Sequence, residues 1–542
     1  MNRLKKILES RFAGIFCFLF AIGNRIIFTS LYSTIGRDTN IQLTYAENLL
    51  GGHGLGTIKY FTTDLDTPVF DTNQRFAPGF SLAITPFLKL AHGDEYAAVL
   101  AFDIIAAIFF MISVRWLGKK GGLSPASNNI VTLIAGCSQY DFFTSYSATD
   151  GIALAFLLLS LAATISLIER KERLSFGYLA VYGLLFFMPG FFRYMYLHFT
   201  LLFPFIIVIY GSFSKNQLLK NNGIRLFITA TLFIILQVGF TYAHNGNVAH
   251  INEPDRGIFP HQVVHWYPFL PASFINLDFA AQLIARVSKF HYSDIFFLFE
   301  PINALLFALL IFLLIRYLRK MKRGTELSQQ QIFIVTGSII ALSVLLLLAY
   351  LSLTYKMLGW AANKWSYCNE TRYFAFIYVF IPLLFFSVFD FNKPVTKKPL
   401  LKSFFYLGLV CFLIEVSHGI YYNAKIVMRH PDLNSIRDGA KDYRSLPILL
   451  DSLKIKYPDR EILVSSPDEF NFYKASQKKY KAIFDYVNLN KSDLRVTKKS
   501  LLVVPIHKAD AWKLKEYVDV KKPILIKSGE ETDFYMEEIN PY

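Results

Sequence analysis

Long apolar runs recur along the whole chain and constrain its fold more than any other feature of the sequence. A run of about 20 apolar residues is long enough to cross the hydrocarbon core of a bilayer as one α-helix. We expect about eleven such crossings, at residues 12–31, 96–114, 130–146, 151–168, 176–192, 196–210, 226–242, 295–315, 332–353, 373–389 and 404–420. The third, fifth and sixth runs are short for a crossing.

The composition indicates contact with lipid. Hydrophobic residues make up 54% of the 542 residues and aromatic residues 16%, which is more than one core surrounded by water needs. Inside a bilayer the backbone must satisfy its own hydrogen bonds, and a helix does so within one segment. The predicted fold class is therefore an all-α polytopic membrane helix bundle.

The basic residues indicate the orientation of this bundle. The formal net charge is +16, and the positive residues gather in every second connection, around residues 5–11, 115–120, 170–173, 215–225, 316–323 and 393–402. This is the positive-inside distribution of membrane proteins. A nucleic-acid-binding protein would instead collect them on one surface with interleaved aromatics, so we expect no nucleic-acid partner. The N-terminus is then cytoplasmic, and an odd number of crossings places the C-terminal region outside.

Four regions follow from this topology. Residues 1–422 form the transmembrane region, residues 33–95 and 243–294 are long outer loops, and residues 423–542 form a soluble tail. Apolar residues at helical spacing predict interfacial helices at 41–49, 80–90 and 279–290. In the tail, apolar runs at 462–464, 501–504 and 524–526 alternate with helical stretches such as 508–518, which predicts a small α/β domain.

Two carboxylates lie where outer helix ends meet the headgroup layer. Asp38 follows the first crossing directly, and Asp150 opens the fourth crossing from the same side. A carboxylate near the bilayer is costly enough that function is a fair expectation, and at this depth it can accept a proton from a water-soluble substrate. The alternative is that these residues cap helices. Asp150 would cap the helix that follows it. In the first loop the cap would be Asp38, or Thr39 in a capping box with Gln42.

Three arginines stand at or near outer helix ends, where the positive-inside rule predicts few cations. They are Arg75, Arg193 and Arg372. The planar guanidinium suits a phosphate, which it can bind through two parallel hydrogen bonds. The alternatives are snorkelling to the headgroups or ion pairs with Asp38, Asp150 or Glu370.

The second outer loop contains His261, His265, Trp266 and Tyr267. These residues could line a sugar site, or the two histidines could bind a metal ion. Solvent-exposed loop residues are the alternative interpretation. Cys17, Cys137 and Cys411 fall in apolar runs and Cys368 in a loop, an arrangement that predicts no disulfide framework.

The order of these motifs resembles the GT-C superfamily of membrane glycosyltransferases, which includes protein O-mannosyltransferases and the aminoarabinose transferases of lipid A. The resemblance lies in residues 37–54, 75–86, 146–151 and 371–373 and covers the membrane region up to about residue 389; the tail shows none. It implies two outer interfacial helices beside a cavity for a sugar linked to polyprenyl phosphate.

The resemblance also implies roles for single residues. Asp38 would be the base that activates an acceptor hydroxyl, Asp150 the second acidic group, and Arg75, Arg372 or Arg193 the ligands of the donor phosphate. His265, Trp266 and Tyr267 would contact the sugar or the acceptor. Some relatives carry paired acids in the first loop, whereas here Arg37 and Thr39 flank Asp38; a divalent cation is therefore not required by the sequence, although the resemblance permits one.

The sequence thus predicts a multi-pass protein of the bacterial inner membrane. Its function would be inverting transfer of a sugar from a polyprenyl-phosphate donor to a lipid, glycan or protein acceptor on the extracytoplasmic side. One alternative is a transporter or flippase for a lipid carrier, which has a similar number of helices but commonly shows repeated halves and broken helices near the midplane. Another is a non-catalytic scaffold whose tail binds partners in the envelope.

Overall fold

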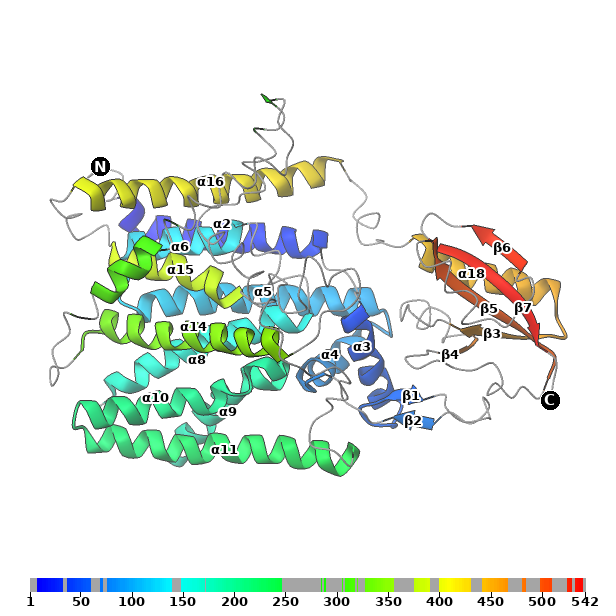
Figure 1. Ribbon diagram of the computed structural model, residues 1–542, viewed down its shortest axis with the longest axis horizontal. Helices are drawn as coiled ribbons and strands as arrows, with labels where there is room; N and C mark the ends of the chain where they lie inside the picture. The colour runs from blue at the N-terminus through cyan, green and yellow to red at the C-terminus, as the bar shows by residue number, and fades with distance from the viewer. Residues whose placement is uncertain are drawn as a thin grey trace. The chain divides into compact units, whose positions relative to one another are not determined.

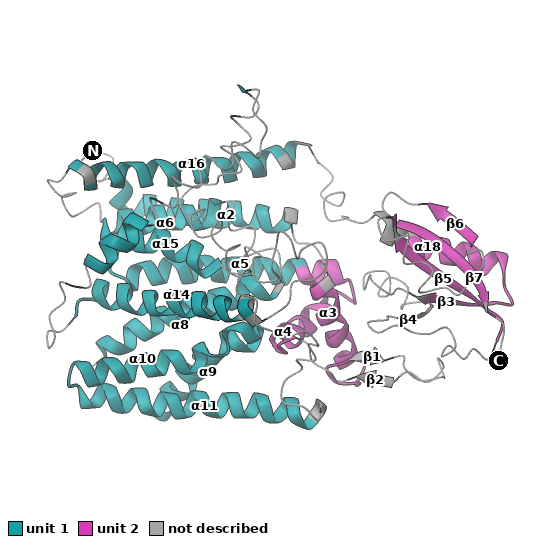
Figure 2. Cartoon of the chain, viewed as in Figure 1, with its two compact units in different colours: residues 1–33, 100–431 teal, residues 34–99, 432–542 magenta. Residues whose placement is uncertain are grey.

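The structure of the chain is a computed structural model. It describes residues 7–32, 37–59, 69–71, 76–138, 148–170, 172–245, 308–316, 327–354, 375–389, 399–429, 441–465, 480–483, 498–508, 524–528 and 532–539, with a few single positions between 284 and 319. The chain divides into two compact units: residues 1–33 with 100–431, and residues 34–99 with 432–542 (Figure 2). The predicted boundary between residues 422 and 423 lies within a helix that continues to Arg429.

The first unit is a bundle of helices whose long members lie roughly parallel to one another (Figure 1). In chain order they are α2 (Arg11–Tyr32), α5 (Glu95–Lys120), α6 (Pro125–Cys137), α8 (Ala148–Glu169), α9 (Phe176–Phe192), the 3₁₀ helix η2 (Tyr194–Tyr196), α10 (Phe199–Phe213), α11 (Gln217–Asn245), α14 (Gln329–Thr354), α15 (Ala375–Val388) and α16 (Pro399–Arg429). Residues 308–316 are also helical. The predicted helix bundle is confirmed.

The predicted number of crossings is not confirmed. Among the described residues, seven helices are long and apolar enough to cross a membrane. They are α2, α5, α8, η2 with α10, α11, α14 and α16. The apolar helices α9 and α15, with 17 and 14 residues, are shorter, and α6 ends after 13 residues at Cys137, whereas the predicted third crossing ran to residue 146. Thirteen helical residues span only about 20 Å.

Side-chain contacts bring the basic connections to one end of the bundle. Asn129 at the start of α6 donates to the carbonyl of Leu8 (2.8 Å) and accepts from Arg115 near the end of α5 (3.2 Å). The start of α14 meets the end of α15 through a hydrogen bond from Gln330 to the carbonyl of Ser387. These helix ends, each next to a basic connection, therefore share one face.

The starts of α9 and α11 meet in the same way. The Arg225 guanidinium donates to the carbonyl of Leu174 (2.9 Å), and Asn222 accepts from the amide of Leu174 (3.2 Å). Gly211 at the end of α10 lies directly against the backbone of Lys220. The basic segments 170–173 and 215–225 are therefore neighbours, as the positive-inside pattern predicts.

The second unit begins with the first outer loop. Helix α3 (Arg37–Leu50) ends at Gly51 and Gly52, and Gly52 has a φ of 80°, the left-handed conformation that glycine adopts without strain. Strands β1 (Thr57–Lys59) and β2 (Val69–Asp71) pair antiparallel, and Pro78 precedes α4 (Gly79–Leu90). Helices α3 and α4 confirm two of the predicted loop helices. The third, at 279–290, lies outside the described residues apart from single positions.

The tail of the second unit is an α/β domain, as predicted. It consists of α18 (Lys441–Lys456), β3 (Glu461–Ser465), β4 (Lys481–Ile483), β5 (Ser500–His507), β6 (Ile524–Ser528) and β7 (Thr532–Ile539). The strand order is β4-β3-β5-β7-β6, with β3 parallel to β4 and β5, and β7 antiparallel to β5 and β6. The predicted helix at 508–518 lies outside the described residues beyond residue 508.

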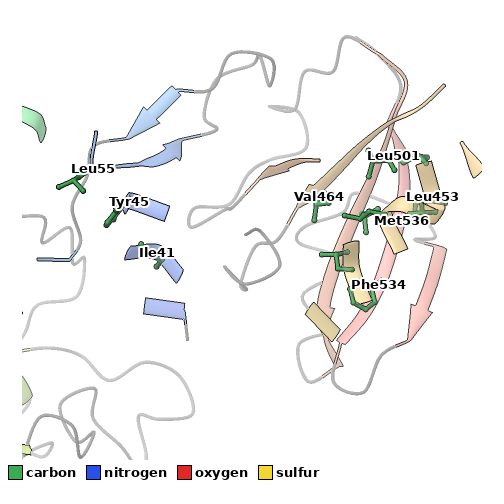
Figure 3. Close-up of a cluster of buried hydrophobic side chains, with 12 residues drawn as sticks. Ile41, Tyr45, Leu55, Leu453, Val464, Leu501, Phe534 and Met536 are labelled. Carbon is green, nitrogen blue, oxygen red and sulfur yellow. The ribbon is translucent and has the colours of Figure 1, made fainter. Parts of the chain in front are cut away.

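The sequence pattern of the strands explains the core of this domain. Alternate residues of β3, β5 and β7 face α18, as the period of two in a strand requires. They are Ile462, Val464, Leu501, Val503, Phe534 and Met536, which pack with Leu446, Leu450 and Leu453 of α18. Figure 3 shows Leu453, Leu501, Phe534 and Met536 in this cluster, where α18 meets the strands. Ile41, Tyr45 and Leu55 are buried side chains of the first outer loop.

Candidate functional site

A buried ion pair joins Asp150 and Arg193 at the end of the bundle opposite the basic connections. Asp150 lies in the first turn of α8 and is only 4% exposed. Arg193 is the residue at which α9 ends, in an extended conformation with φ −146° and ψ 113° that breaks the helix before η2. Its guanidinium contacts the Asp150 carboxylate, and its side chain is 13% exposed. The predicted pairing of Arg193 with an outer carboxylate is therefore present.

This pair corrects the capping alternative for Asp150. Helix α8 begins at Ala148, so Asp150 lies inside its first turn and the N-cap position is not available to it. A buried carboxylate at this position still interacts favourably with the helix N-terminus, and the arginine compensates its charge. Because a guanidinium has five N–H donors, Arg193 can keep its contact with Asp150 and still donate to a second anion.

Asp38 lies in the first turn of α3 and is half-buried. The helix begins at Arg37, so neither Asp38 nor Thr39 occupies the N-cap, and the capping box of Thr39 with Gln42 is a wrong prediction. Gln42 instead donates from Nε2 to the backbone carbonyl of Asp38 (3.1 Å). The carbonyl of Gln42 in turn accepts from the Ser81 hydroxyl of α4 (2.9 Å). Helix α4 thereby holds the turn that carries Asp38.

The remaining predicted site residues lie outside the described residues. These are Arg75, Arg372, His265, Trp266 and Tyr267. Their roles stay predictions. Asp38 belongs to the second compact unit, whereas Asp150 and Arg193 belong to the first, so the structure joins only the last two of the predicted residues.

The structure adds a buried polar cluster between α2, α6 and α16 that we did not predict. Asn24 donates to the carbonyl of Gly136 (2.9 Å) and accepts from Asn423 (3.2 Å), while the Ser138 hydroxyl donates to Glu415 (2.8 Å). Glu415 and His418 lie one turn apart on α16 and are 3% and 5% exposed. The cluster ties the outer parts of three helices together.

An arginine is buried near this cluster. The Arg25 guanidinium of α2 lies 5.1 Å from the ring centroid of Phe110 and 5.8 Å from that of Phe28, distances typical of cation–π contacts. The signal was present in the sequence: Arg25, Glu415 and His418 lie inside apolar runs, where ionisable residues are rare and usually functional. All three lie away from the helix ends at which the site residues were predicted.

No group of three or more His, Cys, Asp or Glu side chains that could hold a metal ion is present in the described part of the chain. The structure therefore names no ligands for the divalent cation that the family resemblance permits.

Comparison with solved structures identifies the architecture. The crystal structure of ArnT from Cupriavidus metallidurans bound to undecaprenyl phosphate matches with a TM-score of 0.54, over 97% of this chain and 98% of ArnT, at 10% sequence identity. The apo form of ArnT matches with a TM-score of 0.52 and 12% identity, over the same shares of both chains. The chain has the fold of ArnT.

ArnT is an aminoarabinose transferase of the GT-C superfamily, so the fold expected from the sequence resemblance is confirmed. The structural likeness covers 97% of the chain and so extends into the tail, where the sequence showed no resemblance. The oligosaccharyltransferase of Archaeoglobus fulgidus has a lower TM-score of 0.46 over 93% of this chain and 68% of its own, at 11% identity. No protein-family model and no curated protein sequence matches the chain.

Proposed function

We propose that the chain is a membrane glycosyltransferase that moves a sugar from a polyprenyl-phosphate-linked donor to a lipid, glycan or protein acceptor. One observation carries this proposal: a buried arginine, Arg193, lies at the bundle end opposite the basic connections, in a fold whose relative ArnT bound undecaprenyl phosphate. Positive charge at a membrane-embedded helix end suits the phosphate of a lipid carrier. By the positive-inside rule this end faces the extracytoplasmic side of a bacterial inner membrane.

In the proposed reaction the Asp38 carboxylate accepts the proton of an acceptor hydroxyl. The acceptor oxygen then forms a bond to the anomeric carbon of the donor, and the bond between that carbon and the phosphate oxygen breaks. The polyprenyl phosphate leaves with the bonding electrons, and attack from the opposite face inverts the anomeric configuration. Asp38 is half-buried at the start of α3, where it is open to a water-soluble acceptor.

The arginines stabilise the phosphate as negative charge develops on it. We assign Arg193 to this role, with Arg75 and Arg372 as further candidates from the first and last outer segments. Asp150 is then a positioning residue, because its carboxylate holds the Arg193 guanidinium in place before the donor binds. His265, Trp266 and Tyr267 remain candidates for contacts with the sugar or the acceptor.

Phosphate recognition can be tested by native mass spectrometry of the full-length protein in lipid nanodiscs. We expect undecaprenyl phosphate to bind at least about tenfold more tightly than undecaprenol, and Arg193→Gln to reduce this difference. The two lipids share the same tail, so the comparison isolates the phosphate. Equal affinity of the wild-type protein for both lipids would contradict the proposal.

A lipid-carrier flippase is the second candidate. The buried Glu415, His418 and Arg25 favour it, because transporters use ionisable groups inside the membrane. Reconstituted vesicles separate the two functions: a flippase changes the leaflet of a fluorescent polyprenyl phosphate and leaves it chemically intact, whereas the transferase removes the sugar from its donor.

A further inference from the structure

Helix α11 carries a buried amide whose hydrogen-bonding capacity is left incompletely used by the described part of the chain. Gln237 is 8% exposed, and neither its Nε2 nor its Oε1 atom makes a hydrogen bond of normal geometry within the described part of the chain. The residue lies inside an apolar span, Gln217–Ala243, about 12 Å from the end of α11 at 1.5 Å per residue. A polar amide left without such a bond inside an apolar span is costly, and a bound polar molecule would remove this cost.

The neighbours of Gln237 indicate the chemistry of that molecule. Thr241, one turn further along α11, is 5% exposed, and its hydroxyl donates to the backbone carbonyl of Gln237 (2.9 Å). The hydroxyl of Tyr194 in η2 faces the side chains of both residues. Tyr194 as a residue is 37% exposed, so its aromatic ring is available for a contact. An amide, two hydroxyls and an aromatic ring thus come together.

A sugar ring fits this set of groups. Each sugar hydroxyl donates and accepts a hydrogen bond, as the two amide atoms of Gln237 require, and the C–H face of the ring packs on an aromatic surface. A water molecule would satisfy the amide but would leave the ring of Tyr194 unused. Arg193 directly precedes Tyr194, so these groups follow the proposed phosphate ligand along the chain.

We propose that Gln237, Thr241 and Tyr194 form the subsite that binds the sugar of the lipid-linked donor through its hydroxyl groups. The inference rests on the proposed function, since it presupposes a polyprenyl-phosphate donor whose phosphate lies at Arg193. It adds the residues that distinguish a glycosylated carrier from a bare one. The amide and the tyrosine hydroxyl then contribute to the choice of sugar.

The test compares lipids that differ only in the sugar. Full-length protein in nanodiscs is titrated with undecaprenyl phosphate and with the same lipid carrying glucose, mannose or aminoarabinose, and binding is followed by native mass spectrometry. We expect the wild-type protein to prefer at least one glycosylated lipid. Gln237→Met, which keeps the volume and removes both polar atoms, should reduce that preference about tenfold and leave the affinity for undecaprenyl phosphate unchanged.

Gln217→Met is the matched control, because Gln217 starts the same helix at its opposite end and pairs only with Asn221 in the described structure (3.0 Å); it should alter neither affinity. An unchanged sugar preference in Gln237→Met overturns the inference, as does a wild-type protein that binds bare and glycosylated lipids equally. If the wild-type protein binds none of these lipids, the proposed function itself fails. Should Gln237→Met not fold, Thr241→Val and Tyr194→Phe carry the same test, each with an expected loss of about threefold.

Discussion

Asp38 carries the chemical step of the proposed reaction, so its substitution is the sharpest change of a single residue. Asp38→Asn keeps the size of the side chain but cannot accept the proton, and loss of a general base reduces turnover by about 100-fold or more. We expect sugar transfer to fall by that factor while membrane insertion and yield stay the same. Glu47→Gln, on the same helix, is the control and should transfer sugar at the wild-type rate. Full activity in Asp38→Asn would show that Asp38 is not the general base of the reaction.

The ion pair between Asp150 and Arg193 predicts that substitutions of the two residues have non-additive effects on stability. Removing either partner leaves a buried charge without compensation, which costs about 3 kcal/mol, whereas removing both avoids this cost. We expect the double variant Asp150→Asn with Arg193→Gln to unfold at a higher temperature than additivity of the single variants predicts. The exposed pair of Arg170 and Glu172 (3.3 Å) is the control, with additive effects. Additivity at Asp150 and Arg193 would show that the buried pair does not act as a unit.

Tyr480 makes the stability of the α/β tail domain depend on pH. Its hydroxyl donates to the Asp451 carboxylate (2.6 Å), and burial together with this neighbour raises the pKa of Tyr480 to about 12. A raised pKa means that the bond stabilises the folded domain fully below the ordinary tyrosine pKa near 10 and is lost as the pH rises towards 12. Tyr480→Phe should therefore destabilise the domain by about 1 kcal/mol at pH 8 and have no effect near pH 12.

Differential scanning calorimetry of the full-length protein at the two pH values measures this difference. Tyr457→Phe is the control, because Tyr457 packs against the same core and should change stability equally at both pH values. An effect of Tyr480→Phe that persists at pH 12 would show that the hydrogen bond is not its cause.

At the scale of elements, the helices and strands were predictable because their periodicities are local. The fifth crossing coincides with α9 to the residue, and the tail strands agree with β3, β5 and β6. The count of crossings was not predictable in the same way. Helix α6 ends at Cys137, and hydropathy alone does not fix the residue at which a helix ends.

Tertiary contacts explain what the sequence could not show about the site. Arg193 and Asp150 are 43 positions apart, and their pairing depends on the rotation of α8 and α9 about their axes. Their positions at helix ends were enough to predict both as site residues. Those positions could not show whether Asp150 caps its helix or forms an ion pair with Arg193. Glu415 and His418 stand out in the sequence as ionisable residues inside an apolar run, but only packing against α2 and α6 shows that they belong to a polar cluster.

The contact between α2 and α6 predicts a sharp steric effect. A Cβ atom at Gly136 would lie 2.5 Å from the Cβ atom of Ala21 and 2.7 Å from its carbonyl oxygen, so Gly136→Ala forces the two backbones apart. Overpacking of this kind costs about 1–3 kcal/mol, and we expect a lower melting temperature in detergent. Gly23→Ala is the control, because a Cβ atom there meets nothing within 4 Å, and alanine is the better helix former. Equal melting temperatures for both variants would contradict the close packing.

At the scale of the whole molecule, the proposed function depends on which side of the membrane each part of the chain faces. The contacts that gather the basic helix ends on one face are present, and the positive-inside rule assigns that face to the cytoplasm. We test this with single cysteines in a chain whose four native cysteines are replaced by alanine. Glu172→Cys, in the exposed connection before α9, should react with a membrane-impermeant maleimide only after the cells are permeabilised.

Ile448→Cys, on the exposed face of α18, should react in intact cells, because the tail is predicted to lie outside. Reaction of both cysteines in intact cells, or of neither, would contradict this topology. If Glu172→Cys reacts in intact cells and Ile448→Cys does not, the tail lies in the cytoplasm. The proposed sugar transfer would then also take place on the cytoplasmic side, contrary to the proposal.

Conversion of the donor tests the central claim most directly. Purified protein is reconstituted into liposomes with the total lipid and glycan extract of its host's envelope, and polyprenyl-phosphate-linked sugars are followed over time by liquid chromatography and mass spectrometry. The account predicts that one glycosylated carrier disappears, that bare polyprenyl phosphate appears in equal amount, and that the sugar is recovered on another molecule. Glycosylated carriers that stay unchanged, or that cross the bilayer with the sugar still attached, would contradict it.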